Sequence, residues 1–283
     1  MERDVDVWMF DTRNNALTRV TTEGRNGQPF WSPDGTRLVY RSAITGPDNI
    51  FWRAANRTDV PERLATSLRN QVATAFTPDG KGLIVQEVSA DLVNGAVSVI
   101  VVPLNGKGSP RPLIEGASGP EPSPDGQWLA YHSNKTGRDE VYVQPYPGPG
   151  PALQISTEGG MMPVWRRDGR ELFYWLPGSG AGRRRTLMGA SITIKPSFQA
   201  GTPKPVLEGP YYVSAPGRSY DVAPDGQRFA LVRADDRVDQ PPLTDMIVVR
   251  NWVEELKHRM QVRRSASQQT RESTSEKQRG AGC

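Results

Sequence analysis

The sequence predicts an all-β fold, a β-propeller of four-stranded blades. A turn-forming tetrapeptide recurs at a period in the forties, which is typical of one four-stranded blade per repeat. Short β-rich runs flank every copy, and blades arranged radially leave only short, protected strand edges. The 28 Gly and 25 Pro among 283 residues also argue against long helices.

The repeated tetrapeptide ends in Pro-Asp-Gly at 32–35, 77–80, 123–126 and 223–226, with a degenerate copy, Arg-Arg-Asp-Gly, at 166–169. Pro sets φ at the second turn position, and Gly suits the left-handed position that follows. We therefore predict five tight β-hairpins. The turn aspartates are interpreted as acceptors for local backbone amides, and not as metal ligands or acid–base groups.

The strands follow from the runs around these turns. Second strands are predicted at 38–40, 83–85, 129–131, 172–174 and 229–231; third strands at 49–52, 97–102, 140–143, 186–192 and 246–249; and fourth strands at 62–65, 112–114, 153–155 and 205–207. Segments 6–11 and 17–21 match third and fourth strands, but no hairpin precedes them. We therefore expect a six-bladed type with an incomplete N-terminal blade and a gap beside Trp8. Since unpaired edges promote association, we also expect self-association.

The domain prediction is a propeller over 1–253, a short helix at 254–260 and a disordered basic and polar tail at 261–283. The net charge is +4, and the positive excess lies near the C-terminus. The nearly neutral body offers no basic face for nucleic acid, so none is expected as a partner. No run approaches 18 apolar residues, so we expect no membrane segment in this chain. The first residues lack the apolar core of an export signal.

Few residues are candidates for a site. Glu121 and Asp221 stand two residues before a turn, on strands expected to line the channel, where they could bind a cationic group. Arg183–Arg185 end a long loop and suit an anionic partner. Two carboxylates do not build a cage for a hard cation, and one terminal Cys and two His leave no Cys or His metal site. We expect His132 and His258 to be surface imidazoles, and we predict no catalytic residue, metal or cofactor.

The turns, each followed by an apolar run and an Ile-Tyr-Val-like strand, resemble the repeat of TolB-type, WD40-like propellers over about residues 5–252. Segments 140–150, 154–160, 169–174, 220–229 and 248–257 resemble the propeller of certain bacterial serine/threonine kinases. In that family a cytoplasmic kinase domain and a membrane helix precede an extracytoplasmic ring, so the resemblance implies an extracytoplasmic or periplasmic location. This chain lacks the glycine-rich loop, the His-Arg-Asp loop and the Asp-Phe-Gly motif, so kinase activity does not carry over.

The expected function is that of a non-enzymatic binding or sensory module. Its partner would be a protein, peptide or glycan, and the module would be part of a larger kinase-like or TolB-like protein. The alternative is a propeller enzyme of the lyase or lactonase type, working at the channel mouth. A histidine facing the channel, or a set of Asp, Asn or Glu residues from most blades, would support that alternative. A third interpretation is a scaffold without a small ligand.

Overall fold

The computed structural model describes residues 5–89, 97–104, 108–148, 150–178, 184–213 and 219–233. All regular secondary structure in these residues is β, as predicted. The predicted strand at 246–249, helix at 254–260 and tail at 261–283 lie outside the described residues. The described strands from β2 onward belong almost entirely to one compact unit, residues 1–9 and 17–236, and the second unit includes the described segment 10–16.

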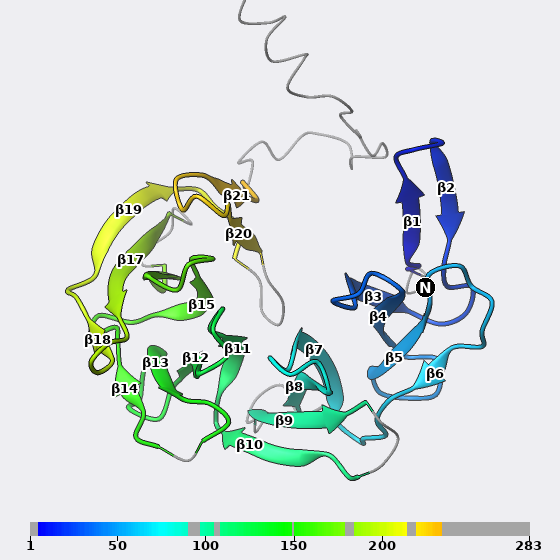
Figure 1. Ribbon diagram of the computed structural model, residues 1–283, viewed down its shortest axis with the longest axis horizontal. Coiled ribbons are helices and arrows are strands. Elements are labelled where there is room, and N and C mark those ends of the chain that lie inside the picture. Colours follow the sequence, from blue (N-terminus) through cyan, green and yellow to red (C-terminus); the bar gives the residue numbers. More distant parts are fainter. Residues whose placement is uncertain are drawn as a thin grey trace, which may run out of the picture. The chain divides into compact units, whose positions relative to one another are not determined.

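Four consecutive antiparallel sheets form most of this unit (Figure 1). They are β3 (Asn26–Trp31), β4 (Arg37–Ser42), β5 (Asn49–Ala54) and β6 (Glu62–Arg63); β7 (Asn70–Phe76), β8 (Gly82–Val88), β9 (Val97–Pro103) and β10 (Arg111–Glu115); β11 (Ser118–Pro122), β12 (Trp128–Ser133), β13 (Glu140–Pro145) and β14 (Leu153–Gln154); and β15 (Met161–Trp165), β16 (Glu171–Trp175), β17 (Arg185–Thr193), β18 (Gln199–Ala200) and β19 (Lys204–Gly209). The fourth sheet has five strands because both β18 and β19 pair with β17. The sequence did not predict β18.

Two shorter sheets flank these four in the sequence. The first pairs β1 (Trp8–Asp11) with β2 (Ala16–Arg19), and the second pairs β20 (Tyr220–Val222) with β21 (Phe229–Leu231). Within the described residues the N-terminal sheet therefore lacks two strands, as predicted. The count of six blades stays a prediction.

The five predicted hairpin turns are confirmed. Their glycines have φ between 68° and 72°, and each glycine N–H donates to the carbonyl of the first turn residue at 2.8–2.9 Å. In the first turn, Asp34 Oδ1 accepts hydrogen bonds from the Ser32 hydroxyl at 2.6 Å and the Thr36 N–H at 3.0 Å. These bonds, the Ser32 hydroxyl first, hold the pKa of Asp34 at about 2. The turn aspartates thus bond locally, as the sequence indicated.

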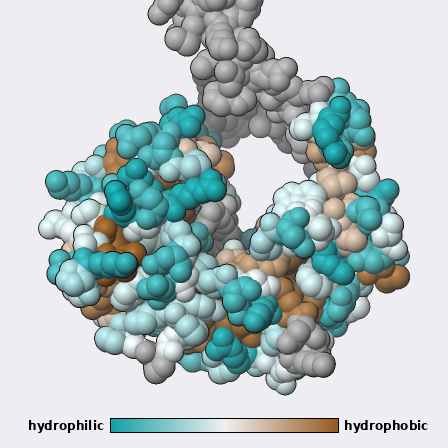
Figure 2. Space-filling model, in the orientation of Figure 1, coloured by the Kyte–Doolittle hydropathy of each residue, from teal (hydrophilic) through white to brown (hydrophobic). Residues whose placement is uncertain are grey.

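The core consists of successive clusters, each between one sheet and the next. Val39 of β4, for example, packs in one cluster with Leu83 and Val85 of β8. Corresponding clusters join Val20 to Tyr40, Ile84 to Leu129, Val143 to Leu172, and Phe173 to Tyr220. The second strand of each four- or five-stranded sheet packs on both sides, which explains its continuous apolar run. On the face seen in Figure 2, hydrophilic residues cover most of the surface and hydrophobic ones show in smaller patches.

Candidate functional site

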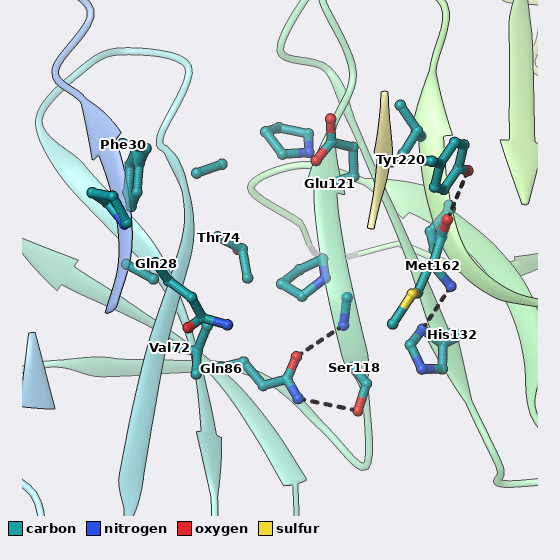
Figure 3. A pocket seen from close by; sticks show the side chains of 18 residues that line it. Gln28, Phe30, Val72, Thr74, Gln86, Ser118, Glu121, His132, Met162 and Tyr220 are labelled. Atoms are coloured by element: carbon teal, nitrogen blue, oxygen red, sulfur yellow. Dashed lines mark hydrogen bonds between the residues drawn. The ribbon is translucent and has the colours of Figure 1, made fainter. Parts of the chain in front are cut away.

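A cavity of about 410 Å³ is lined by the first strands of the four larger sheets together with Tyr220 of β20 (Figure 3). The first-strand residues that line it are Gln28–Phe30 on β3, Val72–Ala75 on β7, Ser118–Pro122 on β11 and Met162–Val164 on β15. Two second-strand residues, Gln86 and His132, complete the described lining. Residues far apart in the sequence therefore meet at one site.

A bulge in each first strand shapes the wall of the cavity. The register between the first and second strand shifts at the same place in all four sheets. In three of them the bulge carries a left-handed residue: Gln28 at φ 49°, Gly119 at 58° and Met162 at 54°. Left-handed backbone is uncommon outside glycine, so Gln28 and Met162 are strained, and strained positions cluster at functional sites.

A proline follows each of these left-handed residues, at Pro29, Pro120 and Pro163, and all three line the cavity. Proline has no N–H to donate, and it is tolerated in a strand only where no ladder bond is needed. At these three positions the wall of the cavity therefore presents an apolar proline ring and no backbone N–H donor. On β7 the corresponding residue is Thr74, whose hydroxyl donates to the Ile84 carbonyl at 3.2 Å.

His132 lies at the cavity wall and is only 7% exposed, so its prediction as a surface imidazole is wrong. Its Nδ1 accepts a hydrogen bond from the Met162 N–H at 3.3 Å. Burial lowers the pKa of the imidazole, and the charge of Asp139 opposes that shift. A Cβ on Gly119 would lie 3.1 Å from ring atoms Cε1 and Nδ1, so the bulge of β11 needs glycine both for its backbone and for this contact.

Gln86 is the second buried polar residue at the wall that the sequence did not single out. Its Oε1 accepts from the Gly119 N–H at 3.0 Å, and its Nε2 donates to Ser118 Oγ at 3.5 Å (Figure 3). These bonds join the second sheet to the bulge of the third. The sequence did contain a signal for Gln86 and His132. The residue directly after the apolar run of the second strand occupies the equivalent position in each of the four larger sheets. These residues are Arg41, Gln86, His132 and Trp175.

The two predicted carboxylates have different environments. Glu121 is partly buried and lines the cavity, and its backbone carbonyl accepts from Trp165 Nε1 at 3.1 Å. Asp221 is exposed on β20 and is not among the described residues that line the cavity. The structure therefore places one of the pair at the site.

Two of the three predicted arginines, Arg184 and Arg185, lie among the described residues. Arg183 lies outside the described residues. Arg184 is exposed and forms an ion pair with Glu208 at 2.8 Å, and Arg185 begins β17. Among the described residues, no arginine lines the cavity.

The described ranges contain no group of three or more His, Cys, Asp or Glu side chains that could hold a metal ion. In the same ranges, no helix is long and apolar enough to cross a membrane.

No family model matches the chain. An uncharacterized protein of Agrobacterium fabrum is 30% identical over 137 residues, which cover 44% of this chain and 46% of that protein. TolB from Acinetobacter baumannii superimposes with a TM-score of 0.53 and 18% identity over 69% of this chain and 48% of TolB. The chain thus spans about half the length of these relatives.

Oligogalacturonate lyase from Vibrio parahaemolyticus superimposes with a TM-score of 0.60 and 12% identity, covering 84% of this chain and 66% of the lyase. Together with TolB, it shows that the fold is a TolB-like β-propeller. The resemblance is confirmed at the level of fold, and its kinase part stays a prediction.

Proposed function

We propose that this TolB-like propeller is a non-enzymatic binding module whose ligand occupies the cavity between the first strands. The observation that carries the proposal is the cavity itself, at about 410 Å³, with proline rings on its wall and a few fixed polar groups. Ligand sites are commonly concave and largely apolar, with a small number of placed polar groups that set orientation. An apolar peptide segment of a partner protein is the ligand that we favour.

The charges at the wall indicate which ligands suit it. Glu121 is the one carboxylate among the described lining residues, which include no Lys or Arg. Burial favours the neutral form of His132. The described lining residues therefore offer an anionic ligand no cationic side chain, and an unpaired anion is costly away from water. We infer that the ligand is not anionic.

One observation favours the enzymatic alternative, a lyase or lactonase type of propeller: His132 faces the cavity, which is one of the two features that would support that alternative. Its Nδ1, however, already accepts the Met162 N–H, so a neutral ring has no free lone pair to take a proton from a substrate. The arrangement therefore fits binding better than general-base catalysis. Incubation with oligogalacturonate tests the alternative, since turnover that His132→Asn abolishes would support it.

Three small molecules of similar shape test the binding proposal: benzylamine, benzamide and benzoate. We expect the cation and the neutral amide to shift the backbone NMR signals of Gly119 and Met162, and benzoate to leave them unchanged. Ala75→Trp should fill the cavity and abolish the shifts. The matched control is Leu68→Trp, because Leu68 is 92% exposed. The proposal is wrong if no compound binds, or if the shifts survive in folded Ala75→Trp.

A further inference from the structure

We infer that His132 determines the specificity of this cavity, as a neutral imidazole that carries its hydrogen on Nε2 and donates it to the ligand. The inference rests on the proposed binding function and adds a chemical preference to it: a ligand that presents a hydrogen-bond acceptor, such as a carbonyl oxygen, to His132 binds more tightly than one of the same shape without it.

The position of the hydrogen follows from the bond to Met162. A backbone N–H can only donate, so the Nδ1 that faces it at 3.3 Å must be the unprotonated nitrogen. A neutral imidazole with a bare Nδ1 carries its hydrogen on Nε2. Nε2 belongs to a ring that lines the cavity, and so becomes a donor for whatever occupies it.

The donor that sets this tautomer is itself held in place. Met162 has a left-handed backbone, and its carbonyl accepts from the Tyr220 hydroxyl at 2.9 Å, which also lies 3.1 Å from the Phe173 carbonyl. Gly119 stands against the Nδ1–Cε1 edge of the ring. Three sheets therefore fix the imidazole, and no flip of the ring is needed to present Nε2 (Figure 3).

The surrounding charges are compatible with a neutral ring. Glu121 lies on β11, and Glu140 lies on β13 beside Val141, the register partner of His132. The Glu140 carboxylate is already bonded to Arg138, Ser156 and Gly159. β15 carries no ionisable side chain. Burial lowers the pKa of His132, with Asp139 opposing, so the ring stays neutral at pH 7.

The free protein provides the first test, because the chain has only two histidines. In the His258→Gln variant, ¹⁵N NMR reports on His132 alone. We expect an unprotonated Nδ1 and a protonated Nε2 at pH 7, with protonation of the ring only below the ordinary histidine pKa. A hydrogen on Nδ1, or a mixture of the two tautomers, would overturn the inference without any ligand.

The second test uses acetophenone and isopropylbenzene, which have nearly the same shape but differ in one carbonyl oxygen. We expect acetophenone to bind about five- to tenfold more tightly, the usual value of one hydrogen bond. His132→Asn keeps an acceptor near the place of Nδ1 and loses the donor, so the preference should disappear. His132→Gln places an N–H near Nε2, so part of the preference should return.

The outcomes separate the two proposals. If neither compound binds to the wild-type protein, the cavity is not a ligand site and the proposed function fails, whatever the tautomer. If both bind equally, or if His132→Asn keeps the preference, the role of His132 is wrong although the cavity binds ligands.

Discussion

Two turn glycines with the same backbone conformation should differ sharply when replaced by alanine. Gly35 and Gly126 have φ of +69° and +70°. Any L-residue in this region costs about 1–2 kcal/mol, so both replacements share this penalty. A Cβ at Gly35 would meet nothing within 4 Å, whereas at Gly126 it would lie 2.5 Å from Pro78 Cβ and 3.0 Å from Pro78 Cγ.

Pro78 cannot rotate away from that contact, because its ring is closed onto the backbone. Overpacking of this kind costs about 1–3 kcal/mol. We therefore expect Gly35→Ala to lower the free energy of unfolding by about 1–2 kcal/mol and Gly126→Ala by about 2–5 kcal/mol. The excess measures the contact between the turns of two neighbouring sheets.

Urea unfolding followed by tryptophan fluorescence measures both values, since the chain has seven tryptophans. A lower midpoint with an unchanged slope reports a change in stability alone. If the two variants lose the same stability within about 0.5 kcal/mol, the close approach of Gly126 to Pro78 does not exist in solution and the reasoning is refuted.

Four further predictions concern other parts of the chain. Glu140 is 1% exposed, and its carboxylate is bonded to half-exposed Arg138. Glu140→Gln should lower the free energy of unfolding in urea by about 1.5–3 kcal/mol, the value of a hydrogen bond to a charged group; a neutral result would contradict its role in the network. Tyr220→Phe removes the hydrogen bond from the hydroxyl to the Met162 carbonyl and should lower the free energy of unfolding by about 1 kcal/mol, measured in the same way. Burial lowers the folded-state pKa of His132. The stability that the neutral ring contributes is therefore complete above pH 6.5, the ordinary pKa, and is lost as the pH falls towards the folded-state pKa. The wild-type protein should thus lose more stability than His132→Asn between pH 7 and pH 5. We propose self-association through the edge of β1, which within the described residues pairs only with β2. Trp8 on this strand is 50% exposed, and Trp8→Lys should shift sedimentation towards the monomer.

The fold was predictable because its defining interactions are local. The Ser-Pro-Asp-Gly turns bond within a few residues, so their sequence alone specifies a hairpin. β18 was not predictable, since it has only two exposed residues and forms on the end of the unusually long β17. Within the described residues it pairs only with the end of the preceding strand, at Ile192 and Thr193, and its own two residues show no preference for a strand.

The site was less predictable, because its environment comes from several sheets at once. Glu121 was identified from its distance to the turn, which places it on the channel side. His132 was misjudged because its own neighbours indicate only the end of a strand, whereas the bulge of another sheet buries it and bonds its Nδ1. Comparison of the equivalent residue in each repeat would have shown a position that varies from Arg to Gln, His and Trp.

The local closure of the turns also has a kinetic consequence. Ser32 Oγ accepts from the Arg37 N–H across only five residues, and Thr77 makes the same bond to Gly82. Isolated hairpins form in about 1–10 μs, and contacts of short sequence separation favour fast folding. The apolar clusters, by contrast, need two sheets together. We therefore expect the hairpins to form early and independently, while the docking of one sheet onto the next sets the overall folding rate.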